Sequence, residues 1–184
     1  NRGAIAPGYL GDFVIIDNFN DFNIEMVYKR GELMYDGQLR DFPTPEIDPY
    51  LVKRAHDTFH LTKLTAEDFK DGRPHAIIGL VPGEIISEDA GYIDHIDVEY
   101  DILKVAVIER HKNTHHIGLG YIKGYGLKSG AVATSISHDS HNIIVVGTNE
   151  EEMAAAANRI VENHGGITVM ENGNVLGEVT LAIA

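Results

Sequence analysis

Short apolar runs separated by glycine and polar turns recur along most of this chain, and they predict a protein rich in β-strands. Many of the runs are rich in valine and isoleucine, which favour the pleated surface of a sheet. Arg30-Gly31 and Asn172-Gly173 each lie between two such runs and predict tight hairpin turns. The expected strands are residues 12–17, 24–29, 32–35, 75–81, 103–108, 118–124, 131–134, 143–146, 167–170 and 175–181.

One segment has helical periodicity, from Asn149 to about Asn163. Thr148 and Glu151 fit a capping box, acidic residues fill the first turn, and Gly165 follows as a stop signal. Because one clear helix stands among many strands, the sequence predicts a predominantly β α+β fold. The expected core-facing stripe of the helix is Met153, Ala156, Ala157, Ile160 and Val161.

The chain divides near residue 50. Residues 1–49 contain three expected strands, too few to bury a core, so this partial small β-domain needs the rest of the chain or a missing partner. Residues 41–49 contain three prolines and predict a stiff, extended linker. Residues 50–184 hold the predicted α+β domain.

Composition narrows the class of protein. The 184 residues include no cysteine, so any metal ion would need histidine and carboxylate ligands. A net charge of −13 argues against nucleic acid or an anionic membrane as the partner. No apolar run is long enough to span a membrane. We therefore expect a cytoplasmic protein that acts on a small molecule.

The densest candidate chemistry lies in residues 135–142, between two strands that read as buried. A sheet can hold such a cluster rigidly, as scaffolds that present functional groups do. Asp, Ser and Asn are also ordinary turn residues, so a polar turn is the alternative, but the two histidines favour a functional role. The candidate residues of this cluster are His138, Asp139, Ser140, His141 and Asn142.

Glu109 and His111 follow another strand in the same way and are further candidates, although Glu109 and Arg110 equally suit a salt-bridged rim. A serine-histidine-aspartate triad within the cluster is disfavoured, because side chains adjacent in sequence rarely reach the required geometry. A separate metal site remains open, because imidazole and carboxylate suit zinc, iron or manganese. Its ligands would be His138, Asp139 and His141.

Several blocks resemble known proteins. The stretch from Gly3 to Asp17, with Val27 to Gly31, resembles the segment that follows the catalytic barrel in the amidohydrolase superfamily, where the chain returns to a small β-domain built from both ends of the protein. The remainder resembles the C-terminal domain of the adenine deaminase family, and the similarity covers essentially the whole chain. The strongest matches are Glu109-Arg110-His111, the glycine-rich block from Gly118 to Leu127, and the block from Ser137 to Gly147.

The resemblance implies a full-length enzyme in which a divalent metal, manganese, iron or zinc, activates a hydroxide that attacks C6 of adenine and yields hypoxanthine and ammonia. In the superfamily the metal ligands lie in a (β/α)₈ barrel and include an H-x-H pair, but this chain contains no H-x-H. It is also too short for a barrel of about 250 residues. We therefore expect no catalytic residue here, no activity from the chain alone, and an N-terminal amidohydrolase barrel as the missing partner. A homo-oligomer also remains open.

Active sites of barrels open at one face, where loops of an added domain can close over the substrate. The resemblance therefore implies a lid over adenine. The alternative is a stand-alone module that binds a purine or a metal ion, and the incomplete β-part at residues 1–40 argues against it. The expected substrate-lining residues are Glu109, His111, His138, Asp139, Ser140, His141 and Asn142.

Overall fold

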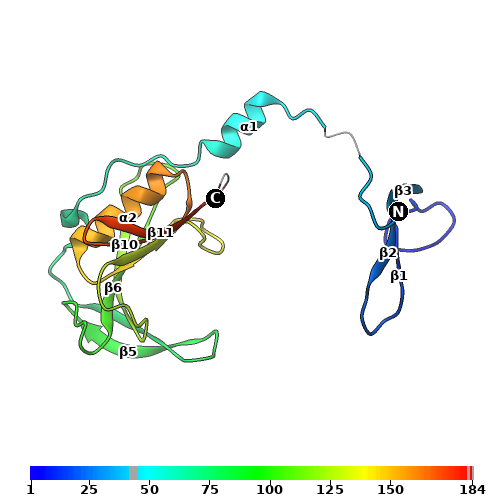
Figure 1. Cartoon of the computed structure of the whole chain (residues 1–184). Coiled ribbons are helices and arrows are strands. Elements are labelled where there is room, and N and C mark those ends of the chain that lie inside the picture. The colour runs from blue at the N-terminus through cyan, green and yellow to red at the C-terminus, as the bar shows by residue number, and fades with distance from the viewer. Residues whose placement is uncertain (42–44, 182, 184) are drawn as a thin grey trace. The chain divides into compact units, whose positions relative to one another are not determined.

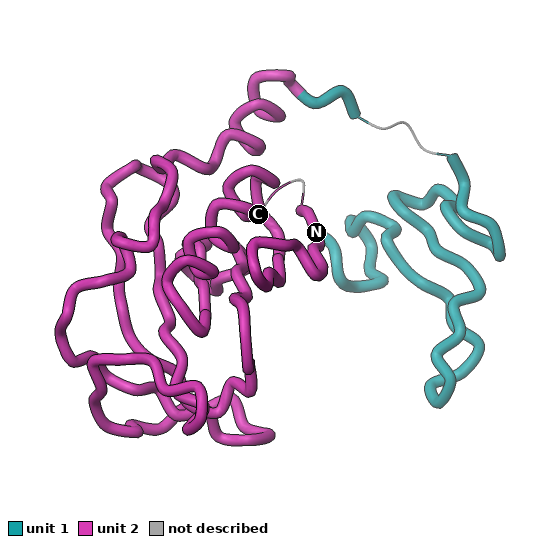
Figure 2. The backbone as a smooth tube through the Cα atoms, turned by 60° about the vertical axis from the view of Figure 1, so that its left-hand side comes forward, with its two compact units in different colours: residues 1–47 teal, residues 48–184 magenta. Residues whose placement is uncertain are grey.

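The computed structural model describes residues 1–41, 45–181 and 183, and the chain forms two compact units, residues 1–47 and 48–184 (Figure 2). Each unit contains one β-sheet (Figure 1). The units divide two residues before the boundary expected from the sequence. Part of the expected linker, residues 42–44, lies outside the described residues, and its last residue, Pro49, already belongs to a helix.

The first unit is a three-stranded antiparallel sheet of β1 (Phe13–Ile16), β2 (Ile24–Lys29) and β3 (Glu32–Tyr35). Arg30 and Gly31 have φ values of 53° and 82°, so the predicted hairpin turn between β2 and β3 is confirmed. Across residues 1–41 and 45–47 no residue is buried. This sheet therefore has two open faces and no core of its own.

The second unit is built around an eight-stranded sheet in the order β11-β10-β8-β9-β6-β7-β4-β5. Neighbouring strands run antiparallel, except that β4 and β7 are parallel. Its elements are α1 (Pro49–His56), the 3₁₀ helix η1 (Ala66–Phe69), β4 (His75–Leu80), β5 (Ser87–Ile93), β6 (Ile102–Ile108), β7 (Ile117–Lys123), β8 (Ala131–Thr134), β9 (Ile143–Gly147), α2 (Glu150–Glu162), β10 (Gly166–Glu171) and β11 (Asn174–Thr180).

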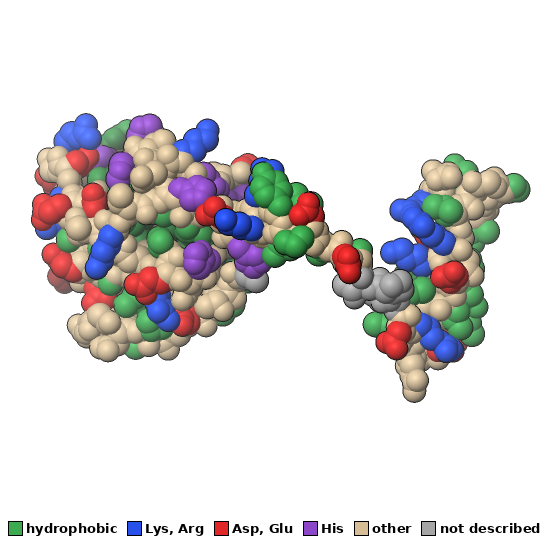
Figure 3. Space-filling view, turned by 90° about the horizontal axis from the view of Figure 1, so that it is seen from above, with side chains coloured by type: hydrophobic (Ala, Val, Ile, Leu, Met, Phe, Trp, Pro, Cys, Tyr) green, Lys and Arg blue, Asp and Glu red, His purple; other side chains and the backbone are tan. Residues whose placement is uncertain are grey.

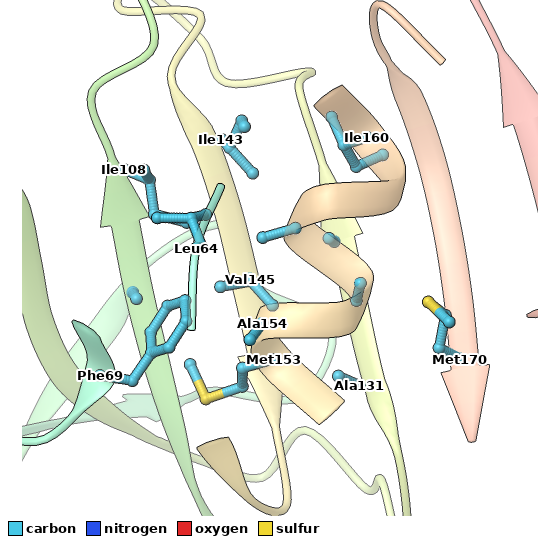
Figure 4. Close-up of a cluster of buried hydrophobic side chains, with 14 residues drawn as sticks. Leu64, Phe69, Ile108, Ala131, Ile143, Val145, Met153, Ala154, Ile160 and Met170 are labelled. Carbon is cyan, nitrogen blue, oxygen red and sulfur yellow. The ribbon is translucent and has the colours of Figure 1, made fainter. Parts of the chain in front are cut away.

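The core lies between α2 and one face of this sheet (Figure 4). Small residues on α2 let the helix approach the strands closely, and Phe69 of η1 closes the space beside Met153. The expected stripe of α2 is confirmed, with Val161 at its partly buried margin. The buried residues of α2 are four members of this stripe, Met153, Ala156, Ala157 and Ile160, together with Ala154.

The expected capping box at the start of α2 is wrong by one residue. Asn149, not Thr148, is the N-cap, because Asn149 is still extended, with φ of −161°, and its Oδ1 accepts a hydrogen bond from the amide of Glu152 at 2.8 Å. The Thr148 hydroxyl instead donates to the carbonyl of Gly130 at 3.1 Å, so it belongs to the end of the sheet.

The fold class expected from the sequence is confirmed: the molecule is mostly β, with a large mixed sheet and a small antiparallel sheet at the N-terminus. All the expected strands form, each within one residue at either end, and the Asn172-Gly173 hairpin joins β10 to β11. α1 and β5 were not expected. Among the described residues no helix has the length and apolarity needed to cross a membrane.

Two strands bound the large sheet. β11 lies at one edge and all seven of its residues are exposed. β5 lies at the other edge, and most of its residues are exposed as well.

Candidate functional site

Strand pairing brings the two groups of candidate residues together at one end of the large sheet. β6 and β9 are antiparallel neighbours, and Ile108 at the end of β6 is paired with Ile143 at the start of β9. The segment that follows Ile108 therefore lies beside the segment that precedes Ile143. We name residues 135–142, which join β8 to β9, the histidine loop.

The backbone of the histidine loop is held from the side by two donors. Arg110, which is only 1% exposed, donates from Nε to the carbonyl of His141. His111 Nε2 lies 2.9 Å from the carbonyl oxygen of Ser140, the preceding residue of the loop. Two adjacent residues after β6 thus fix two adjacent carbonyls of the loop, which restricts its movement relative to the sheet.

Arg110 is itself held by a segment before η1. Its Nη1 donates to the Thr58 hydroxyl at 3.1 Å, and its guanidinium carbon lies 4.0 Å from the centre of the Phe59 ring. Burial lowers the pKa of the Arg110 guanidinium, which nevertheless stays charged. Sequence patterns do not connect residues 58 and 59 with the loop, because about fifty positions separate them from Arg110.

Within the histidine loop the chain makes a tight turn. The amide of His141 donates to the carbonyl of Ser137 at 2.8 Å, and the hydroxyls of Ser137 and Ser140 lie 3.1 Å apart. Asp139 and His141 have φ values of 68° and 52°, a left-handed conformation that Asp and His adopt more readily than most residues. The turn alternative therefore describes the backbone of this segment correctly.

The side chains at the tip of the loop point to solvent. His138 Nδ1 lies 3.0 Å from Asp139 Oδ1, and the two side chains are 96% and 89% exposed. His141 is also exposed, whereas Asn142 is partly buried and its Oδ1 has no hydrogen-bond partner within the described residues. The tip thus presents an imidazole-carboxylate pair on a firmly held backbone. Histidine side chains are spread over the surface of this unit (Figure 3).

The carboxylate of Glu109 is hydrogen-bonded within its own loop. Its carboxylate accepts hydrogen bonds from the amides of His111 and Lys112, at 2.6 and 2.9 Å, and from the amide and hydroxyl of Thr114. Burial alone would raise the pKa of the Glu109 carboxyl, but the bonds from Thr114, His111 and Lys112 outweigh it and bring the pKa to about 2. Glu109 is therefore an anion that shapes the turn after β6.

His60 lies at the same end of the sheet. Its Nδ1 lies 2.9 Å from the carbonyl oxygen of His111, and its Nε2 lies 2.9 Å from Asp57 Oδ1. The bond to Asp57 and then the bond to the His111 carbonyl raise the pKa of His60. His60 therefore supports the segment that holds the histidine loop.

The separate metal site considered for His138, Asp139 and His141 does not form. Throughout residues 1–41, 45–181 and 183, no three histidine, aspartate or glutamate side chains are placed to hold one metal ion. The donor set of the described chain therefore does not fit the divalent metal that the family resemblance implies.

Comparison with known proteins identifies the family. Residues 84–184 match the family model described as adenine deaminase C-terminal domain. The chain belongs to the adenine deaminase C-terminal domain family. It is 37% identical to an adenine deaminase of Lysinibacillus sphaericus over 100% of its length, and 40% identical to adenine deaminase 1 of Rhizobium etli over 100% and to an adenine deaminase of Petrotoga mobilis over 98%.

The chain spans a third of each of these relatives, 33% of their length. The family match includes all of β6 to β11, the histidine loop and the segment from Glu109 to His111. All seven candidate residues lie in the part of the chain that the adenine deaminase family model matches.

Proposed function

We propose that this chain is the C-terminal segment of a metal-dependent adenine deaminase, which converts adenine and water to hypoxanthine and ammonia. The observation that carries the proposal is the match to adenine deaminases along the whole chain. Among the described residues no three histidine, aspartate or glutamate side chains are placed to hold one metal ion, which supports a site for manganese, iron or zinc in the rest of the enzyme. We expect the segment alone to be inactive. The lack of cysteine is consistent with a cytoplasmic enzyme.

The histidine loop is proposed to cover the substrate. Adenine presents ring nitrogens and an exocyclic amine, which imidazole and carboxylate groups can recognise by hydrogen bonds. Two features support this role: the side chains of His138 and Asp139 are free to meet a partner surface, and the backbone beneath them is fixed by Arg110 and His111. Such a preorganised loop loses little conformational entropy when it closes on a ligand.

Residues 1–49 are proposed to complete a small β-domain with strands from the N-terminal part of the enzyme and to link it to the domain at residues 50–184. The first sheet has no buried residue, and one of its faces carries an apolar hollow of about 270 Å³. Strands from elsewhere in the protein would cover such a hollow. Its lining is Ile24, Val27, Met34, Tyr35 and Leu39.

The function is tested by assaying adenine turnover in two proteins, the 184-residue chain and the full-length protein that contains it, each supplied with manganese, iron or zinc. The full-length protein should release ammonia from adenine, whereas the chain alone should not. Turnover by the isolated chain, with contaminating enzyme excluded, contradicts the proposal, and so does a full-length protein that is inactive on adenine with every metal.

The covering role is tested with His138→Ala in the full-length protein. Loss of one well-placed hydrogen bond in the transition state lowers kcat by about two to three powers of ten. The melting temperature should stay unchanged, because the His138 side chain is exposed. His95→Ala is the matched control, since His95 also pairs with a neighbouring aspartate, Asp94, at 2.8 Å and is exposed at another place on the surface. If both variants keep full activity, the loop is only a turn.

A further inference from the structure

The large sheet has one face covered by α2 and η1, and a second face that no helix covers in the described chain. Strand pairing defines the second face, because residues paired across neighbouring strands share a side. Val107 is paired with both Gly118 and Ile144, and Thr134 is paired with both Ile144 and Ile167. We name this side the open face. Its members on the six central strands include Ile78, Leu103, Val105, Val107, Gly118, Gly120, Ile122, Val132, Thr134, Ile144, Val146, Ile167 and Val169. Leu103 and Val146 are buried, and the other members are partly or fully exposed.

On the six central strands these members of the open face are all uncharged, although the chain carries a net charge of −13. Asp89 of the edge strand β5, which is paired with Ile78, is a charged residue that borders the face on that side. Ile78, Val107 and Ile167 are 44%, 39% and 36% exposed. In a sheet with one solvated face the outward positions are normally polar. Aliphatic side chains on six adjacent strands therefore indicate a surface that another layer covers.

The open face is not flat, because it contains a hollow. Gly118 and Gly120 lie side by side with Val107 and Val105, and the missing side chains leave a hollow of about 270 Å³ between these valines and Ile78. A methyl group added at Gly118 would meet only one backbone oxygen, at 4.0 Å. The hollow is thus open to an apolar side chain from outside.

The area of the open face helps to identify what covers it. Six strands about 4.8 Å apart, with a face four residues deep at about 3.3 Å per residue, give about 400 Å². A stable complex between separate proteins buries about 800 Å² on each partner, whereas domains joined in one chain make do with about 600–1,500 Å² in total. A covalent tether raises the effective concentration to the millimolar range, so the smaller face suffices.

The lengths of the relatives point the same way, because two thirds of each adenine deaminase lies outside the part that this chain matches. We propose that the open face docks, within one polypeptide, on the remainder of the adenine deaminase through an uncharged, apolar surface. The inference rests on the proposed function only in taking this chain as part of a longer enzyme.

The test uses the absence of cysteine from this chain. Val107→Cys is made in the 184-residue chain and in the full-length protein, and the reaction of the introduced thiol with a maleimide is followed by peptide mass, so that other cysteines do not interfere. Glu151→Cys is the matched control, since the Glu151 side chain is 69% exposed on α2, on the opposite side of the sheet.

We expect the thiol of Val107→Cys to react readily in the short chain at every protein concentration. In the full-length protein its reaction rate should be lower by a factor of roughly ten or more. The thiol of Glu151→Cys should react alike in both. Fast reaction at position 107 in both proteins means that nothing covers the face. Protection in the short chain that grows with its concentration identifies a second copy, and protection independent of concentration identifies residues 1–47. Each of these three results overturns the proposal.

A second variant guards against an effect of folding. Val107→Arg should leave the melting temperature of the short chain unchanged, because that side chain is already partly exposed, and should lower that of the full-length protein by several degrees. Equal melting shifts in the two proteins contradict docking. Adenine turnover is measured separately, so an inactive full-length protein whose thiol at position 107 is protected refutes the proposed reaction and leaves the docking intact.

Discussion

The two units use the same local devices and differ in what covers them. Both contain hairpins with turn residues at positive φ, Arg30-Gly31 in the first unit and Asn172-Gly173 in the second. In the second unit a helix packs on β8, β9 and β10 on one face of the sheet, and Ile160 is 0% exposed. In the first unit no described residue is buried. Turn chemistry and strand propensity therefore specify strand pairing, whereas stability depends on a second layer.

The largest expected difference is in hydrogen exchange of the isolated chain. Amides of β6 and β9, in the middle of the large sheet, should open only with global unfolding, which costs about 5–15 kcal/mol in typical domains. Amides of β2 should exchange through local opening that costs little. Exchange read by mass spectrometry measures both. Equal protection in a chain shown to be monomeric would mean that the first sheet is covered by something in the same chain.

The next largest expected difference between the units is in the effect of shortening an isoleucine side chain to alanine. Ile160→Ala removes a fully buried side chain from α2 and should lower the free energy of unfolding by about 2–5 kcal/mol, because it leaves a cavity. Ile24→Ala makes the same chemical change on β2, where Ile24 is 48% exposed, and should change it by no more than about 0.5 kcal/mol. Urea unfolding of the two variants compares them. A large loss for Ile24→Ala would show a core in the first unit.

Low pH should also destabilise mainly the second unit. Burial opposes ionisation of the Glu109 carboxyl, but its bonds to Thr114, His111 and Lys112 prevail and lower its pKa from an ordinary 4.5 to about 2. A group with a lowered pKa in the folded state stabilises it fully above pH 4.5, and this contribution is lost as pH falls toward 2. Melting curves over this range should show a steeper loss for the wild type than for Glu109→Gln. Parallel curves would show that Glu109 does not contribute.

The smallest effect concerns the cap of α2. Asn149→Ala should lower stability by about 1 kcal/mol, because the amide of Glu152 loses its acceptor. Asn149→Gly should cost only a few tenths of this, since glycine is an acceptable N-cap residue. Thermal melts distinguish the two variants. An equal loss for both would assign the effect to the backbone at residue 149 and not to its side chain.

Sequence patterns predicted most of the elements because their signals are local. The α2 stripe repeats at helical spacing, and the turn at Asn172-Gly173 needs only two adjacent residues. β5 was not predicted because its sequence, Ser-Glu-Asp-Ala-Gly-Tyr-Ile, belongs to an exposed edge strand and shows no apolar run. α1 was not predicted because it buries no residue and therefore has no core-facing stripe. Its N-cap is Asp48, whose side chain accepts a hydrogen bond from the amide of Tyr50.

The candidate site was harder to predict, because contacts between distant segments determine it. Proximity of residues 109–111 to the histidine loop follows from the pairing of β6 with β9, which are separated in the chain by β7 and β8. The sequence identified the loop by its unusual composition. It did not show that Arg110 would be the buried support, because an arginine after a strand normally reads as a surface residue.

The two edges of the large sheet differ in their risk of aggregation. Unpaired strand edges recruit other extended chains, and acidic side chains on an edge oppose this by repulsion. β5 carries Glu88 and Asp89 in a chain that is already strongly acidic, so identical copies repel one another there. The single acidic side chain of β11, Glu178, is paired with Arg159, while Leu176 and Val179 are 64% and 59% exposed. Amyloid-like growth of the isolated segment would therefore start at β11.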